Sequence, residues 1–178
     1  FGDMYAGYLV LANFGLAKDT WLPSQAGQPE VFDLTEASPT EDGTGGVITG
    51  VKTAFDSCWL FKSSSLWRIV DGGDVGLQGN LFTASVGCVA SESIVEFFSP
   101  ALGRRMLFFW SAIGPYLFDG NQPLYIGEPI KGKPNTAPYS LIGEAAQRNI
   151  VALDVAKLNQ VWVFVKGDAN GRVYAMAG

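Results

Sequence analysis

Histidine is absent from the 178 residues of this sequence, and several kinds of reactive site are excluded with it. Ser-His-Asp and Cys-His nucleophile systems need an imidazole as the general base, and many zinc sites need it as a ligand. The glycine patterns of a P-loop, a dinucleotide-binding turn and a hydrolase nucleophile turn are also missing. We therefore expect no catalytic, cofactor-binding or metal-binding residues, and we expect that the protein is not an enzyme.

Cysteine is scarce. The chain has two cysteines, Cys58 and Cys88, and both lie inside or beside apolar runs. Their separation matches no metal-ligand spacing. We favour the interpretation that both are buried free thiols, and the sequence alone leaves a disulfide between them open.

Positive charge and long apolar runs are limited as well. Twelve lysine and arginine residues stand against 17 aspartate and glutamate residues, so the net charge is −5. A protein that grips nucleic-acid phosphates would carry a basic stripe, whereas Arg104 and Arg105 are the one adjacent basic pair. No apolar run approaches the ~18 residues of a membrane-spanning helix. The sequence thus disfavours a nucleic-acid clamp and predicts no membrane span.

Short aromatic and β-branched runs dominate what remains. Between Gly87 and Gly120 three such runs, Ser93–Phe98, Met106–Trp110 and Pro115–Phe118, are separated by turn residues. Runs of this kind are strands, and close neighbours pair as antiparallel hairpins. The 22 glycines and nine prolines of the chain supply the many turns that such a fold needs. This stretch predicts a small up-and-down sheet.

The same arrangement recurs along the chain. Equivalent phenylalanines, Phe61, Phe109 and Phe164, lie 48 and 55 residues apart, and Val10 lies 51 residues upstream of Phe61. An isoleucine at the centre of an upstream strand precedes each phenylalanine by 13 to 15 residues; these are Ile48, Ile94 and Ile150. A repeat of about fifty residues made of short strands is typical of β-propeller blades.

We therefore predict an all-β fold, a propeller-like array of about three to four antiparallel blades. The blade-like repeats cover roughly residues 7–35, 47–84, 87–127 and 147–176 of a single domain, or of a fragment of one, within 1–178. Closed propellers have typically about four to eight blades, and the sequence begins with Phe1 and not with methionine. We expect a partial or processed chain, or neighbouring chains that cover its open faces.

The repeat also predicts the core. The aromatic side chains expected to be buried are Trp59, Phe61, Phe109, Phe118, Trp162 and Phe164, with Ile48, Ile94 and Ile150 beside them.

Five groups of charged or polar residues could have a functional role, and each has a plainer structural interpretation. Glu41 and Asp42 could bind a cation weakly, but they lie in the polar segment Glu36–Gly46, which we expect to be exposed and mobile. Asp71 and Asp74 could serve as an acid–base pair, but the glycines between them indicate a turn.

Asp168 and Asn170 alternate as in a calcium loop, although a hairpin turn is the favoured interpretation. Arg104 and Arg105 are expected in a solvated turn, with pairing to an acidic partner as the alternative. Glu92 and Glu96 flank Ile94, and we expect them on the polar face of a half-buried strand.

The order of several short motifs, over about residues 7 to 130, resembles the β-propeller of tail-nozzle and related tail proteins of short-tailed bacteriophages. The motifs are Leu11-Ala12-Asn13, Trp21-Leu22-Pro23-Ser24, Pro29-Glu30-Val31-Phe32, Gly45-Gly46-Val47-Ile48-Thr49-Gly50, Leu60-Phe61-Lys62, Ser65-Leu66-Trp67-Arg68, Gly87-Cys88-Val89, Ile94-Val95-Glu96-Phe97 and Tyr116-Leu117-Phe118-Asp119-Gly120. The sequence departs from the usual pattern at Thr20, Pro23 and Ala112-Ile113.

This resemblance implies a structural component of a virion, a nozzle-like tail or neck protein that forms part of the DNA exit channel. Its implied partners are other copies of itself and neighbouring virion proteins in a ring or tube, with DNA passing without specific binding. Carboxylates in loops and turns could form an acidic channel wall, or could serve only to keep the surface soluble; they are Glu36, Glu41, Asp42, Asp71, Asp74 and Asp119.

Two other classes stay open. A glycan- or receptor-binding propeller would use exposed tryptophan and tyrosine side chains, which stack on sugars as readily as they pack between blades. A propeller glycosidase is the third class. Fold alone does not decide among them.

Overall fold

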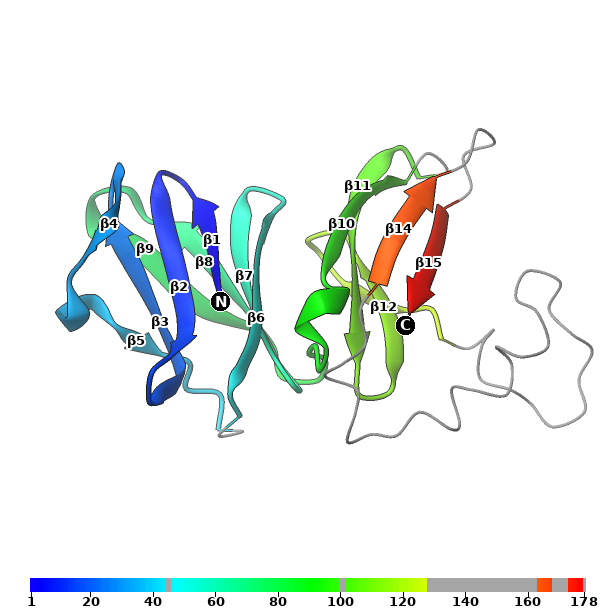
Figure 1. The fold of residues 1–178 in the computed structure, drawn as a ribbon, viewed down its shortest axis with the longest axis horizontal. Coiled ribbons are helices and arrows are strands. Elements are labelled where there is room, and N and C mark those ends of the chain that lie inside the picture. The colour runs from blue at the N-terminus through cyan, green and yellow to red at the C-terminus, as the bar shows by residue number, and fades with distance from the viewer. Residues whose placement is uncertain (44–45, 100–101, 128–162, 168–172, 178) are drawn as a thin grey trace, which may run out of the picture.

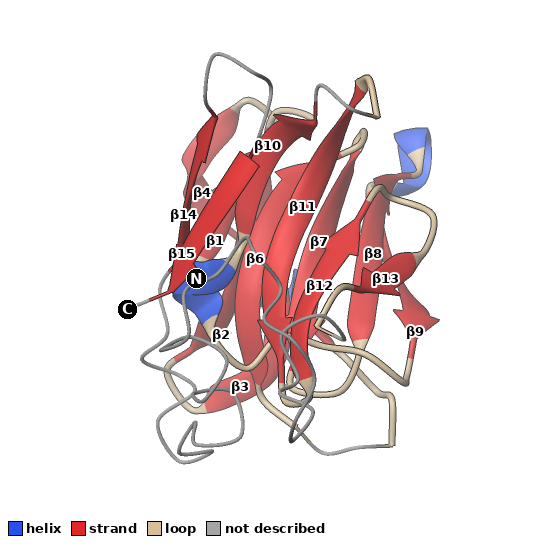
Figure 2. Cartoon of the chain, turned by 90° about the vertical axis from the view of Figure 1, so that its right-hand side faces the viewer, coloured by secondary structure: helices blue, strands red, loops and turns tan. Residues whose placement is uncertain are grey.

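The computed structural model describes residues 1–43, 46–99, 102–127, 163–167 and 173–177. These residues form an all-β structure in which every paired strand is antiparallel to its neighbour. The described part contains three short 3-10 helices and no α-helix. Four sheets follow one another along the molecule in sequence order (Figure 1), and the axes of their strands are roughly aligned (Figure 2).

Sheet 1 is formed by the N-terminal strands. They are β1 (Gly2–Tyr5), β2 (Tyr8–Phe14), β3 (Ala17–Gln25), β4 (Gln28–Phe32) and β5 (Ser38–Pro39). The order is β1-β2-β3-β4, and β5 also pairs with β3. The 3-10 helix η1 (Leu34–Glu36) lies between β4 and β5.

Sheets 2 and 3 each contain four strands in sequence order. Sheet 2 consists of β6 (Ile48–Ala54), β7 (Ser57–Lys62), β8 (Leu66–Asp71) and β9 (Leu77–Thr83), with η2 (Gly73–Val75) before β9. Sheet 3 consists of β10 (Val95–Ser99), β11 (Arg104–Ser111), β12 (Gly114–Phe118) and β13 (Pro123–Tyr125), preceded by η3 (Ser91–Ser93). Sheet 4 is the pair β14 (Val163–Gly167) and β15 (Val173–Ala177).

Sheet 2 lies between sheets 1 and 3, and the burial of its strand β7 on both faces explains this position. All six residues of β7 are buried. Because successive side chains of a strand point to opposite faces, they divide between two interfaces. Cys58 and Leu60 pack against sheet 1, whereas Trp59 and Phe61 pack against sheet 3. A strand buried on both faces needs a continuous apolar run, and this sequence supplies one.

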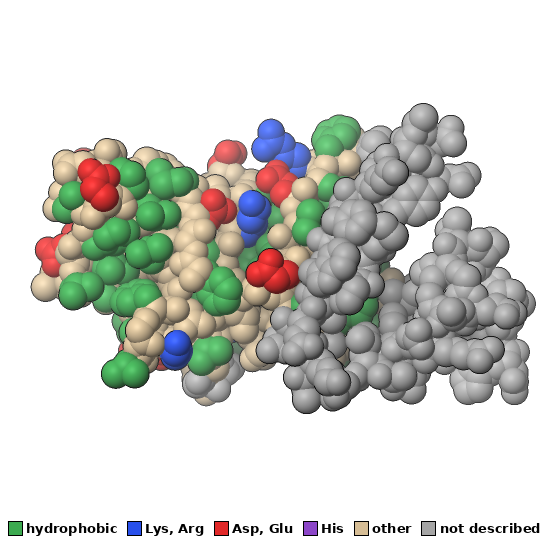
Figure 3. All heavy atoms as spheres, in the orientation of Figure 1, with side chains coloured by type: hydrophobic (Ala, Val, Ile, Leu, Met, Phe, Trp, Pro, Cys, Tyr) green, Lys and Arg blue, Asp and Glu red, His purple; other side chains and the backbone are tan. Residues whose placement is uncertain are grey.

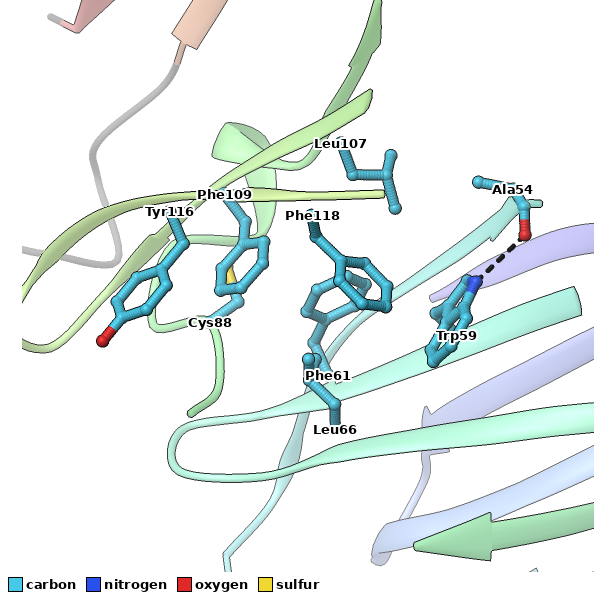
Figure 4. Packing of buried hydrophobic residues seen from close by; sticks show 9 residues of the cluster. All are labelled: Ala54, Trp59, Phe61, Leu66, Cys88, Leu107, Phe109, Tyr116 and Phe118. Atoms are coloured by element: carbon cyan, nitrogen blue, oxygen red, sulfur yellow. Dashed lines mark hydrogen bonds between the residues drawn. The ribbon is translucent and has the colours of Figure 1, made fainter. Parts of the chain in front are cut away.

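The interface between sheets 2 and 3 is built from aromatic rings (Figure 4). The ring of Trp59 meets the rings of Phe118 and Phe82 edge-on, with centroids 4.7 and 5.1 Å apart. Phe61 and Phe109 pack at 5.3 Å. Such pairs contribute about 0.5–1.5 kcal/mol each beyond the area they bury. The Trp59 indole also donates a 2.9 Å hydrogen bond to Ala54 O, so its polar edge is satisfied.

The interface between sheets 1 and 2 depends on a close approach. The ring of Trp21 in β3 lies over Gly79 in β9, and a Cβ at that glycine would stand 3.2 Å from the ring. Tyr5 in β1 accepts a hydrogen bond from Asp71 N and donates one to Asp56 O, so it attaches sheet 1 to the end of sheet 2 where the β6–β7 turn and the end of β8 lie together.

The hairpin turn between β6 and β7 has an unusual backbone. Phe55 and Asp56 both adopt the left-handed conformation, with φ of 53° and 54°. Two consecutive left-handed residues match the twist of a tight hairpin, yet a phenylalanine seldom adopts that conformation. Phe55 is held there by packing, because its ring meets Phe118 edge-on at 5.9 Å and lies against Gly120.

The all-β, antiparallel part of the sequence prediction is confirmed. Ile48, Trp59, Phe61, Phe109 and Phe118 are fully buried, as predicted. Ile94 is half-buried and packs against the same cluster. Trp162, Ile150 and the greater part of 147–176 lie outside the described residues, and Phe164 falls in β14, of whose side chains nothing is described.

Several predicted element boundaries are wrong. Ile48, expected at the centre of its strand, is the first residue of β6. The run Ser93–Phe98 is not one strand: η3 ends at Ser93 and β10 begins at Val95, so Ile94 stands at the start of the strand and not at its centre. The reason is the buried Ser93 hydroxyl, which donates to Ala90 O at 2.6 Å and accepts from Trp110 N at 2.8 Å.

As a result Glu92 lies in η3, and only Glu96 lies in the strand. Arg104 and Arg105 open β11 and do not form the turn. Near the N-terminus, β1 (Gly2–Tyr5) lies ahead of residue 7, where the first predicted repeat begins.

Replacing Phe109 tests the aromatic interface. Phe109 is fully buried, contacts Phe61 and stacks on Tyr116 with centroids 5.6 Å apart. Phe109→Ala is expected to lower the free energy of unfolding by about 3–5 kcal/mol, because it empties an aromatic site. Ile113→Ala, at a side chain that is 60% exposed, should change it by less than about 0.5 kcal/mol. Urea denaturation measures both, and equal midpoints would show that the aromatic interface contributes nothing.

Candidate functional site

The structure separates the carboxylates that the sequence singled out. Asp71 and Asp74 are both exposed, and Asp71 Oδ1 accepts a 2.9 Å hydrogen bond from Gly73 N. Asp71 therefore shapes the turn that leads into η2, which is a structural use of its carboxylate. Glu36 and Glu41 are exposed as well.

Asp119 and the two arginines form ion pairs. Arg104 Nη1 lies 2.6 Å from Asp119 Oδ2, and Arg105 Nη1 lies 3.5 Å from Glu96 Oε1. Partial burial opposes ionisation of Asp119, but hydrogen bonds from the backbone N–H groups of Asn121 and Gln122, together with Arg104, hold its pKa below the ordinary value. The structure therefore confirms the alternative interpretation of the two arginines, in which each pairs with an acidic side chain.

Asp42 corrects the expectation of an exposed polar segment at Glu36–Gly46. Its side chain is 0% exposed and lies 2.9 Å from Lys62 Nζ, which belongs to a side chain only 1% exposed. The hydroxyl of Ser65 donates to the other carboxylate oxygen, Oδ2. Lys62 Nζ also donates a 3.1 Å hydrogen bond to Thr40 O. Because Asp42 is held inside the protein, it cannot act as an exposed cation ligand or as a wall carboxylate.

We call Thr40, Asp42, Lys62 and Ser65 the buried polar cluster. It lies where the chain passes from sheet 1 to sheet 2, and it attaches that crossover to the turn between β7 and β8. The turn itself is closed by a 2.9 Å hydrogen bond from Lys62 N to Ser65 O. The cluster therefore fixes the path of residues 40–43 against sheet 2.

The second crossover, from sheet 2 to sheet 3, meets the same turn. Cys88 N donates a 2.8 Å hydrogen bond to Lys62 O, and Thr49 Oγ1 donates to Cys88 O. Gly87 lies so close that a Cβ there would stand 2.6 Å from Ser64 N and overlap Lys62 O. Lys62 thus joins both crossovers, one through its side chain and the other through its carbonyl.

The two cysteines are free and buried. They face opposite interfaces, Cys58 toward sheet 1 and Cys88 toward sheet 3. Burial raises the pKa of Cys58 to about 12 and that of Cys88 to about 11, although weaker hydrogen bonds partly oppose the effect. Such thiols stay protonated and unreactive at neutral pH.

The structure does not support the remaining possibilities for a metal site or a membrane-spanning helix. Asp168 and Asn170 lie outside the described residues. Within the described ranges, no group of three or more cysteine, aspartate or glutamate side chains could hold a metal ion. In the same part of the chain, no helix has the length and apolar character that crossing a membrane requires.

Comparison with known proteins finds no matching family model and no matching curated sequence.

Sequence reasoning missed the role of Lys62. Lys62 ends an otherwise apolar run and is followed by three serines, so it looks like the first polar residue of a turn. The available signal was its place in β7, next to Phe61, where a buried strand would require a partner for any charge. Asp42 gave no such signal, because it lies 20 residues upstream among polar neighbours.

Alkaline unfolding tests the buried thiols. Their pKa values in the folded protein exceed the value of 9.0 of an unperturbed thiol, so the unfolded chain loses these protons first. Stability is therefore complete below pH 9 and declines as pH rises toward 11 and 12, by about 1.4 kcal/mol per pH unit for each thiol. Urea denaturation between about pH 8 and 10 should show a shallower decline in the double variant Cys58→Ala, Cys88→Ala. Identical slopes would contradict thiol burial.

Proposed function

We propose that this protein is a structural component of a bacteriophage virion, a propeller-type element of a nozzle-like tail or neck protein that forms part of the DNA exit channel. The observation that carries the proposal is the stack of consecutive antiparallel sheets. Sheets 1, 2 and 3 each place four strands in sequence order, and each interface joins only sheets that follow one another in the chain. Propeller blades share this strand order and this packing.

Contacts between the first strands of the sheets support a propeller more than a simple stack. β1 contacts β6, β6 contacts η3 just before β10, and β10 contacts β14. In a propeller the first strand of each blade lies closest to the central axis, so these strands approach one another there. The channel of the proposed assembly would then run beside β1, β6 and β10.

The charges on these strands suit passage of DNA. Asp3 in β1 accepts a hydrogen bond from Thr53 N at 2.7 Å and lies 3.9 Å from Lys52 Nζ in β6. Glu96 in β10 pairs with Arg105. Acidic and basic side chains lie side by side over the middle of the face shown in Figure 3. Cations that are already engaged by carboxylates offer less attraction to phosphates.

These strand residues replace the loop carboxylates as candidates for the wall. Asp42 is buried and Asp119 is paired with Arg104. Asp71 ends β8, which β7 separates from β6, and Asp74 lies in η2 between β8 and β9. In the proposed arrangement the wall is therefore formed by Asp3 and Glu96 and not by the turns.

The glycan-binding alternative receives less support. It requires exposed aromatic rings, but the four described tryptophans, Trp21, Trp59, Trp67 and Trp110, are at most 8% exposed. Trp21 and Trp67 pack between sheets 1 and 2, Trp59 packs between sheets 2 and 3, and Trp110 packs against other residues of sheet 3 and its flanking segments. Their use is structural, as expected for a scaffold.

The oligomeric state of the purified chain tests the structural role. The face of sheet 1 turned away from sheet 2 leaves apolar side chains such as Met4 exposed, at 49%, and Figure 3 shows apolar side chains gathered there. We expect electron microscopy and sedimentation to show rings or tubes. Met4→Lys should weaken assembly, whereas Ile113→Lys, which adds the same charge at another exposed apolar site, should not. A monodisperse monomer would rule against the proposal.

Duplex DNA binding tests the channel. At about 50 mM salt, where phosphate contacts are strongest, we expect no micromolar binding by the wild-type assembly. Glu96→Lys on β10 should introduce binding that weakens steeply with salt. Glu30→Lys, the same change on the exposed outer strand β4, should introduce much less. Tight, salt-sensitive binding by the wild type, or an equal gain in both variants, would remove the channel from the proposal.

A further inference from the structure

The buried polar cluster contains an amine and a carboxylate that water does not reach. The side chains of Lys62 and Asp42 are 1% and 0% exposed, and Lys62 Nζ lies 2.9 Å from Asp42 Oδ1. Because Oδ1 is bonded to Cγ, this contact also places the amine nitrogen close to the carboxyl carbon, and holding reacting groups together in this way favours a reaction between them. Burying two charges is unfavourable unless every remaining polar atom is satisfied, and removing both charges relieves that cost.

We propose that Lys62 and Asp42 form a covalent isopeptide bond. Lys62 Nζ first passes a proton to Asp42 Oδ1 along their hydrogen bond, which gives an amine and a carboxylic acid. The amine nitrogen then attacks Asp42 Cγ, and a bond between Nζ and Cγ forms. A second proton moves from Nζ to Oδ1, the bond between Cγ and Oδ1 breaks, and Oδ1 leaves as water. An ammonium and a carboxylate thus become one amide and one water molecule, with no other reactant.

The neighbours of the pair suit both the reaction and its product. Ser65 Oγ donates to Asp42 Oδ2, the oxygen that carries negative charge during the attack and becomes the amide carbonyl. Thr40 O accepts from Lys62 Nζ at 3.1 Å, and the single N–H of the amide can keep that bond. Both polar atoms of the product therefore retain the partners they have now.

The mass of the intact wild-type chain under denaturing conditions tests the proposal. We expect it to be lighter than the sequence mass by one water molecule. Trypsin should then release residues 19–52 joined to residues 53–68, because the acylated Lys62 is not cleaved. A chain of full sequence mass, with separate peptides ending at Lys52 and Lys62, would overturn the proposal, whatever the variants do.

Variants distinguish the isopeptide bond from other reactions that also release one water molecule. Asp42 precedes Gly43, and cyclisation of an Asp-Gly peptide also releases water. Lys62→Met should restore the full mass, while Lys52→Met, at a lysine beside Asp3 in an accessible pair, should keep the loss. A loss of water that persists in Lys62→Met would overturn the proposal. Ser65→Ala should slow bond formation by about 100-fold, the usual effect of removing one donor to a developing oxyanion.

Discussion

The burial of the Lys62 side chain is the constraint on which the connections between the sheets depend. A charged amine out of reach of water must have partners, and removing one member of such a pair destabilises a protein by about 3–5 kcal/mol. Here the partners come from the crossover that enters sheet 2, while the crossover that leaves sheet 2 bonds to Lys62 O. One turn, Lys62–Ser65, therefore sets the position of two connections that lie on either side of it in the sequence.

The aromatic packing then determines how the sheets lie on one another. β7 is buried on both faces, so sheet 2 cannot exist as a surface layer, and its two sets of alternating side chains specify two different neighbours. Edge-on contacts around Trp59 and Phe118 give the interface with sheet 3 a definite geometry, which purely aliphatic packing would fix less strictly. The left-handed turn at Phe55 is a local cost that this packing offsets.

The sequence was sufficient to predict most of the strands and much of the core, because alternation and turn residues are local signals. Trp59, Phe61, Phe109 and Phe118 were identified in this way. It was not sufficient for Ile94, since the strand start depends on the hydroxyl of Ser93 bonding to Trp110, 17 residues away. The pairing of Asp42 with Lys62 was missed for the same reason: a polar segment looks solvent-exposed until the residue that neutralises its charge is known.

The stacking of each sheet on its sequence neighbour has a consequence for synthesis. Every strand pairing within sheets 2 and 3 joins strands that follow one another directly in the chain, so each sheet can close soon after its last strand leaves the ribosome. Sheet 1 can form first and then offers Trp21 and Val10 as a template for β7. Sheet 2 in turn exposes Trp59 and Phe61 only until β11 and β12 arrive. The order of translation is thus also the order in which the apolar faces are covered, and a pause after sheet 2 would be the moment of greatest risk of aggregation.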